Sequence, residues 1–225
     1  MTTTILVIMP KRRHHRKQPR LLKDDVDSDT SDDEDDPDVH RQGEIIYFHC
    51  DVSTKNVLQL IRALNAATCH AFTHNIPHIT LYVHSLGGCA FAGLSAYDHI
   101  RNCRLPVHTV ADGFVASAAT LICLAGAKRY AHRHACLLIH ELSTGMSGKL
   151  AELVEEVGNS KVTMRIIRSV YEERTSVPIT ELKAMLKKES MLPFERAKEL
   201  GFVEGEPFKG VQNTGTQTRH TIFGS

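Results

Sequence analysis

The 225-residue sequence predicts an α/β fold with a mostly parallel sheet. Three observations lead to this prediction. Short β-prone runs alternate with helical patterns along the chain, and such alternation requires crossover connections between strands. Tryptophan is absent and aromatic residues amount to 6%, so the core must consist mainly of aliphatic side chains. A content of 42% hydrophobic and 24% charged residues fits one globular domain large enough to bury such a core.

The formal net charge of +1 conceals two blocks of opposite charge. Residues 11–23 read KRRHHRKQPRLLK, and residues 24–38 read DDVDSDTSDDEDDPD. Residues 1–43 hold 8 basic and 10 acidic residues, so the rest of the chain, with 19 basic and 16 acidic residues, is mildly basic. Because residues 1–43 lack apolar periodicity, burial cannot offset the entropy of ordering them, and we expect a disordered tail.

These features disfavour several classes of protein. No run of 18 apolar residues exists, so no transmembrane helix is expected, and the apolar residues 5–9 precede the basic cluster, which is the reverse of a secretory signal. Six cysteines without a CxxC pair predict reduced thiols in an intracellular, cytoplasmic setting. The near-neutral balance disfavours membranes and nucleic acid as partners. The KRRHHRK cluster leaves a nuclear or viral host-cell setting open.

After the tail, the first elements follow in order. Residues 45–48 are a β-prone run, and Ser53 stands where it can cap a helix. The apolar side chains of that helix recur at helical spacing until Pro77 breaks the pattern. Residues 79–83 form the next expected strand, and a second helix is expected over 90–101.

The middle of the chain continues the alternation. Residues 107–111 predict a third strand, and Gly113 is expected to introduce a small-residue helix over 116–124. Tyr130 and residues 137–139 mark two more strands.

Helices dominate the last part of the chain. A long amphipathic helix is expected over 149–174, and Thr180 is expected to cap a short helix after it. A last helix is expected over 193–200, with Gly201 closing its carboxyl-terminal end. Residues 205–225 are rich in Gly, Thr and Gln, and we expect a flexible tail there.

Three segments carry residue types suited to chemistry. The adjacent glycines of residues 85–88, SLGG, allow backbone N–H groups to point outward and hold an oxyanion or phosphate. In residues 113–119, GFVASAA, Ser117 stands at a helix start, where free N–H groups stabilise developing negative charge. His140 ends an apolar strand, a position from which histidine can serve as general base. Taken alone, each segment is equally compatible with a purely structural turn, packed serine or strand end.

In combination, these segments resemble the proteolytic subunit of the Clp protease family, a self-compartmentalising serine peptidase. The matching stretches are LYVHSLGGCAFAGLSAYDHIR, VHTVADGFVASAATLICLAGAKRYA, CLLIHEL and LPFERAKELGFVE. They are similar to the family's strand–SPGG–helix segment, GxAAS serine turn, AGAKxKR segment, MIHQ histidine and SAxEAxEYGLVD end. The resemblance spans residues 44–204, between the two tails. It implies a ClpP/crotonase-like fold: a repeated ββα superhelix with a mostly parallel sheet and a protruding long helix.

The resemblance also implies roles for five residues. Ser117 falls on the family's nucleophile and His140 on its general base. Glu189 falls on the acidic third member, where the family has aspartate. The backbone N–H groups of Gly88 and Ala118 fall on the oxyanion hole. The implied activity is that of a serine endopeptidase acting on unfolded or small polypeptides inside an oligomeric chamber, with no cofactor.

The family's assembly implies partners for this chain as well. Its members form stacked seven-membered rings, and the long helix makes the contact between rings. They also dock an unfoldase of the AAA+ class through an amino-terminal axial segment. Because the charged tail takes the place of that segment here, an unfoldase is a possible partner but a doubtful one. The implied partners are therefore further copies of the chain and a peptide or protein substrate.

Several alternatives stay open. A non-catalytic ring subunit stays open because of the glutamate at position 189 and the charged tail in place of the family's axial segment. An acyl-CoA enzyme of the crotonase fold also uses backbone oxyanion donors, although it does not need a Ser–His pair. A polyanion-binding protein led by KRRHHRK is disfavoured by the acidic run that follows. Metal binding by His132, His134 and Cys136, or by His70 and His74, is not expected, because chance pairs are common among 14 histidines.

Overall fold

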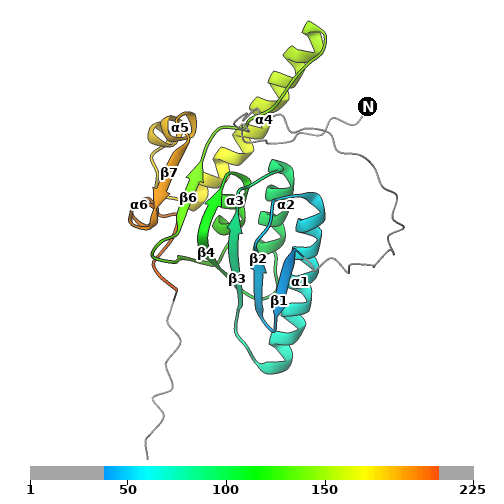
Figure 1. The fold of residues 1–225 in the computed structure, drawn as a ribbon, viewed down its shortest axis with the longest axis vertical. Helices are drawn as coiled ribbons and strands as arrows, with labels where there is room; N and C mark the ends of the chain where they lie inside the picture. Colours follow the sequence, from blue (N-terminus) through cyan, green and yellow to red (C-terminus); the bar gives the residue numbers. More distant parts are fainter. Residues whose placement is uncertain (1–37, 208–225) are drawn as a thin grey trace, which may run out of the picture.

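Parallel pairing dominates the sheet in the computed structural model, which describes residues 38–207 (Figure 1). Within these residues the sheet has seven strands in the order β1-β2-β3-β4-β6-β7, and β5 pairs with β4. The antiparallel pairs β1–β2 and β6–β7 lie at the two ends of the sheet. The strands are β1 Val39–Gln42, β2 Ile45–Phe48, β3 Ile79–Ser85, β4 Val107–Ala116, β5 Lys128–Ala131, β6 Cys136–Ile139 and β7 Ser190–Pro193. The predicted α/β class with a largely parallel sheet is confirmed.

Helices cover one face of the sheet, while one long helix extends beyond it (Figure 1). On β3, Ile79, Leu81 and Val83 are fully buried under the helices, whereas Tyr82 and His84 on the opposite face are more exposed. The helices are α1 Thr54–His74, α2 Ala90–Arg101, α3 Ala118–Leu124, α4 Leu150–Arg174, α5 Ile179–Lys187 and α6 Phe194–Glu199. The protruding long helix that the sequence predicts is α4. Within residues 38–207, no helix is long and apolar enough to cross a bilayer.

The start of α1 is determined by a side-chain cap. The Ser53 hydroxyl accepts a hydrogen bond from the backbone N–H of Asn56 at 3.1 Å, as predicted. After His74 the chain leaves the helix through Asn75 in the left-handed conformation, two residues before Pro77. The predicted cap and the break before the proline are both confirmed.

The core is mainly aliphatic. Ten of the twelve largest fully buried side chains are Ile or Leu, and the other two are Phe48 and Phe202. All six cysteines are free thiols, and none forms a disulfide in the described part of the chain.

The sheet begins earlier than the sequence predicts. Residues 39–42 pair with β2 through a two-residue turn, and Gly43, at φ 62, occupies the first position of that turn. Val39 is buried on the core side, which favours this pairing although the rest of the strand is polar. The expected tail therefore ends before residue 38. Residues 1–37 and 208–225, which carry the rest of both expected tails, lie outside the described residues.

Two further boundaries differ from the prediction. β4 continues through Gly113 to Ala116, because residues 114–116 gain partners on β6, so α3 begins only at Ala118. The cap position of α5 is occupied by Pro178 rather than Thr180. Proline is favoured near a helix start because the missing N–H has no intrahelical partner there.

Candidate active site

Three loops meet where parallel strands end. β3, β4 and β6 are neighbours in the sheet, and they are followed by SLGG, by Ser117 and by His140 respectively. Parallel strands end at the same edge of a sheet, so the three segments identified from the sequence come together. We call residues 85–88 and 116–118, with His140, the Ser117 junction.

Ser117 occupies a strained turn between β4 and α3. Its φ of 55° and ψ of −127° lie in a region that residues with a side chain rarely adopt, at a cost of about 1–3 kcal/mol. Two contacts hold the backbone there: the Ser117 N–H donates to the Leu138 carbonyl at 2.8 Å, and the Thr120 N–H donates to the Ser117 carbonyl at 3.0 Å. Such a sharp turn from strand to helix projects the hydroxyl from the end of the sheet.

The two glycines of SLGG fit against this turn because they have no side chain. A Cβ on Gly87 would lie 2.7 Å from both the Ser117 Cβ and the Ala116 carbonyl oxygen. A Cβ on Gly88 would lie 2.4 Å from the carbonyl oxygen of Val52. Both glycines also have positive φ, 97° and 147°. Close approach to the serine turn thus explains why glycines occur here.

Two backbone N–H groups in the Ser117 junction are free to bind a ligand. The neighbouring N–H groups of Gly87 and Cys89 donate to Ser85 Oγ and to the Val52 carbonyl. Within residues 38–207, those of Gly88 and Ala118 donate to no backbone or side-chain acceptor. The Ala118 nitrogen would lie 3.3 Å from a Cβ on Gly87, so the two segments adjoin. The free donors are the two that the resemblance assigns to an oxyanion hole.

His140 is held in the tautomer that a general base requires. It follows β6 directly, and its Nδ1 lies 2.5 Å from the carbonyl oxygen of Glu141. A carbonyl only accepts, so Nδ1 carries the proton and donates it, which leaves Nε2 as a free acceptor.

Ser117 and His140 line the same small cavity. Its volume is about 20 Å³, enough for roughly one water molecule. In the described part of the chain, no hydrogen bond joins the Ser117 hydroxyl to the imidazole. The cavity is lined by Ala90, Ser117, Ala118, Leu121, His140, Glu141, Leu142, Ile167 and Tyr171.

A buried hydroxyl pair supports the serine turn from beneath. The Thr120 hydroxyl donates to the Ser117 carbonyl at 2.6 Å, and the Tyr171 hydroxyl lies 2.6 Å from Thr120 Oγ1. Because the single proton of Thr120 is used, Tyr171 is the donor. Burial raises the pKa of Tyr171 to about 12, which keeps that donor protonated. Sequence patterns did not identify this pair, because the two residues are 51 positions apart.

Glu189 directly precedes β7, the strand that pairs with the strand before His140. The last β6–β7 pair is Ile139 opposite Ser190, so His140 and Glu189 each stand one residue beyond it. Glu189 has φ 54 and is exposed. In the described residues its carboxylate makes no ion pair or hydrogen bond with His140, whose Nδ1 is bonded to the Glu141 carbonyl instead.

Three of the four histidines considered as metal ligands, His70, His74 and His132, make other contacts. His132 Nδ1 lies 3.0 Å from an oxygen of Asp112, and His49 Nε2 lies 3.3 Å from the other oxygen. The rings of His70 and His74 stack with 4.0 Å between centroids. Within residues 38–207, no group of three or more His, Cys, Asp or Glu side chains is arranged to hold a metal ion.

Comparison with known proteins gives a consistent result. Residues 41–205 match the family described as Clp protease. Three curated relatives are named ATP-dependent Clp protease proteolytic subunit. That of Pleurastrum terricola is 30% identical over 126 residues, 55% of this chain and 64% of the relative. That of Chlorokybus atmophyticus is 30% identical over 128 residues, which are 56% of this chain and 57% of the relative. That of Ostreococcus tauri is 32% identical over 126 residues, which are 55% of this chain and 63% of the relative. The chain thus covers less than two thirds of the length of each.

Proposed function

The chain belongs to the Clp protease family, and from this premise we propose that it is a serine endopeptidase acting on unfolded or small polypeptides. One observation carries the proposal. Ser117 and His140 line one cavity, beside the two free backbone donors of Gly88 and Ala118. Nucleophile, base and oxyanion donors are the parts that acyl transfer through a serine requires.

Each part has a defined step in peptide hydrolysis. Ser117 Oγ attacks the peptide carbonyl while Nε2 of His140 accepts the hydroxyl proton and later returns it to the leaving amine. The N–H groups of Gly88 and Ala118 bind the oxyanion that forms, and one such donor lowers the barrier by about 2.7–4 kcal/mol in enzymes of this kind. A water molecule, activated by the same histidine, then releases the acyl group from the serine.

Substrate binding completes the Ser–His contact in this proposal. The two side chains share a cavity without a hydrogen bond, and catalytic hydrogen bonds of free enzymes often shorten only when a substrate is bound. A peptide carbonyl held by the backbone donors would fill the cavity and keep water out of it.

We further propose Glu189 as the third catalytic residue. Glu189 and His140 each stand one residue beyond the last β6–β7 pair. Relative to aspartate, its extra methylene lengthens the reach of the carboxylate toward Nδ1. In that arrangement the carboxylate replaces the Glu141 carbonyl as acceptor of the Nδ1 proton and stabilises the imidazolium formed during catalysis.

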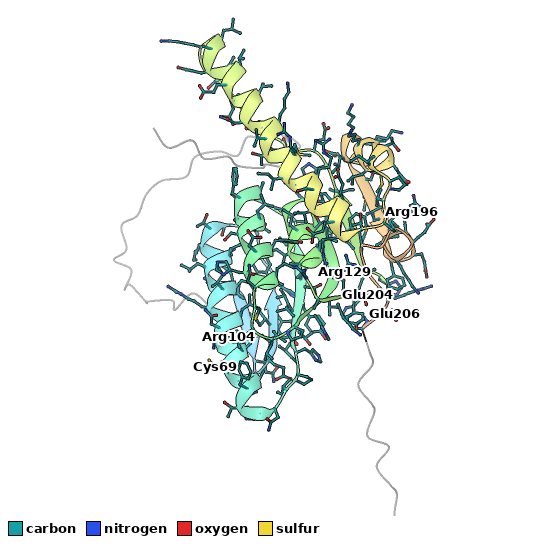
Figure 2. All side chains as sticks on the ribbon, turned by 180° about the vertical axis from the view of Figure 1, so that it is seen from behind. Cys69, Arg104, Arg129, Arg196, Glu204 and Glu206 are labelled. Atoms are coloured by element: carbon teal, nitrogen blue, oxygen red, sulfur yellow. The ribbon has the colours of Figure 1, made fainter. Side chains whose placement is uncertain are left out.

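Exposed apolar side chains on α4 support an oligomer. Leu150 is 78% exposed and Val154 65% exposed, on a half of the helix that stands clear of the body (Figure 2). Val162 and Ile166 are also exposed farther along the helix. Contiguous apolar surface of this kind marks an interface between proteins. We propose that α4 joins copies of the chain, in the stacked seven-membered rings typical of the family.

The two candidate roles of the chain are separated by one assay. A non-catalytic ring subunit remains the second candidate, because Glu189 makes no contact with His140. Hydrolysis of an unstructured fluorogenic peptide is expected from the wild type and is expected to vanish in Ser117→Ala. Ser95→Ala, an exposed serine on α2, serves as the matched control and keeps full activity. Equal hydrolysis by Ser117→Ala rejects the nucleophile, and an inactive wild-type oligomer supports the second candidate.

A further inference from the structure

A second, larger groove adjoins the cavity at Ser117. It lies between α4 and α5, which are neighbours in Figure 2, and has a volume of about 610 Å³. Glu141 and Leu142 line both this groove and the small cavity that contains Ser117 and His140. The groove and the cavity therefore adjoin each other at these two residues.

The groove is strongly basic. Three cationic side chains come from one face of α4 at helical spacing and two from α5, and only Glu141 among the lining residues is acidic. Arg168 has a distant partner in Glu172 at 4.0 Å. In the described part of the chain, the other four cations make no ion pair. The cations are Lys161, Arg165, Arg168, Lys183 and Lys187.

Apolar side chains lie among the cations, so the groove is both basic and partly apolar. Leu142 and Met146 come from the segment after β6, Met164 from α4 and Leu186 from α5. A glutamate side chain matches both properties, since its methylenes pack on apolar atoms while its carboxylate reaches a lysine or arginine.

We propose that this groove is a subsite for acidic side chains of the polypeptide substrate. The inference rests on the proposed function, because it names the substrate class of the same site. Two observations favour a substrate segment over other occupants. The groove shares lining residues with the Ser117 cavity, and within residues 38–207 four of its cations make no ion pair. Acidic residues flanking the bond to be cleaved bring carboxylates to those cations.

Binding can be measured without catalysis. Full-length Ser117→Ala is titrated into three fluorescent peptides of equal length, identical except that Glu, Gln or Lys occupies alternate positions. The Glu peptide is expected to bind about tenfold more tightly than the Gln peptide, and the Lys peptide most weakly. Because exposed charges are screened by salt, raising the ionic strength is expected to reduce this preference. Equal binding of all three peptides, or no binding by the assembled chain, overturns the proposal.

Reversing the charge of two groove lysines tests whether the preference for the Glu peptide comes from the groove. Lys183→Glu with Lys187→Glu is expected to lower affinity for the Glu peptide about tenfold and to leave the Gln peptide within about twofold. The matched control, Lys128→Glu with Lys198→Glu, makes the same change of charge on exposed side chains outside the groove. If the control lowers affinity equally, the preference comes from net charge alone and the groove is rejected.

A parallel measurement keeps the two proposals apart. Wild-type chain is treated with a serine-directed phosphonate, which reports the nucleophile without any peptide. Labelling together with equal binding of the three peptides rejects the acidic subsite and keeps the peptidase. Preference for the Glu peptide without labelling rejects the peptidase and leaves the groove as a binding site for acidic peptides.

Discussion

The Ser117 junction and the amino-terminal half of α4 differ in what determines them. In the junction, SLGG lies so close to the serine turn that a Cβ on Gly87 would come within 2.7 Å of two different atoms. On α4, a Cβ on Gly158 would meet nothing within 4 Å, and Leu150 and Val154 face solvent. The junction is therefore specified by contacts within one chain. The start of α4 has a capping contact within its own chain, between the Lys149 N–H and Glu152. Its exposed apolar side chains, by contrast, are what an interface between copies requires.

The largest effect is expected when the junction loses its proposed base. His140→Ala should reduce peptide hydrolysis by a factor on the order of 10⁶, as loss of the catalytic histidine does in serine peptidases. Steady-state hydrolysis of a fluorogenic peptide measures this loss. His134→Ala, an exposed histidine beyond β5, is the matched control and should retain wild-type turnover. A modest loss in His140→Ala would assign the base to another residue.

A pair of glycine substitutions tests the comparison directly. Gly87→Ala should lower the free energy of unfolding by about 3 kcal/mol, because the new methyl group meets backbone and the positive φ is strained. Gly158→Ala should raise it by about 0.5–1 kcal/mol, since alanine is favoured inside an exposed helix. Urea unfolding followed by circular dichroism gives both values. Similar changes in the two variants would contradict the tight packing of the junction.

A pH dependence is expected from the hydroxyl pair under the serine turn. Burial raises the pKa of Tyr171 to about 12, above the value of about 10 for an exposed tyrosine. The folded state therefore holds the proton more tightly, and this contribution is complete below pH 10. It is lost as the pH rises from about 10 to 12, which lowers the free energy of unfolding by about 2–3 kcal/mol.

The measurement compares wild type with Tyr171→Phe at both ends of that pH range. Between these two pH values, the free energy of unfolding should fall less in the variant than in the wild type. The difference between the two falls is the contribution of Tyr171. The buried Cys123 thiol, whose pKa burial also raises to about 12, is present in both chains and cancels in the difference. Parallel pH curves for the two proteins would show that the phenol does not stay protonated in the fold.

The smallest effect on stability is expected from substitutions of exposed apolar residues on α4. Leu150→Asp with Val154→Asp should change the unfolding free energy of the protomer by less than about 0.5 kcal/mol, because both side chains are exposed. The same change should convert the oligomer into a monomer, as measured by native mass spectrometry. Glu155→Gln, also exposed on α4, is the control that should stay assembled. An unchanged mass in the aspartate variant would remove this half of α4 from the interface.

The sequence predicted what local patterns determine. The run from Ala90 to Arg101 was expected as a helix with the bounds that the structure has, and Ser53 was expected as the cap it is. The positions of Ser117 at a helix start and of His140 at a strand end followed from the same alternation of strands and helices. These features depend on residues close together in the chain.

Features that depend on distant partners were not predicted. β1 and β7 are four-residue strands without a clear alternating pattern, and each exists because it pairs with the edge of a neighbouring strand, β2 or β6. β4 continues past Gly113 for the same reason. The support of Ser117 by Thr120 and Tyr171, and the meeting of cations from α4 and α5, join residues that no local pattern connects.

The attachment point of a serine-directed phosphonate tests most directly whether Ser117 is the nucleophile that the junction activates. The wild-type chain is treated with the reagent and digested with a protease, and the masses of its peptides are measured by mass spectrometry. The expected result is one adduct, on the peptide that contains Ser117, which disappears in Ser117→Ala. An adduct on another serine, or none on an assembled wild-type chain, would contradict the proposed activity.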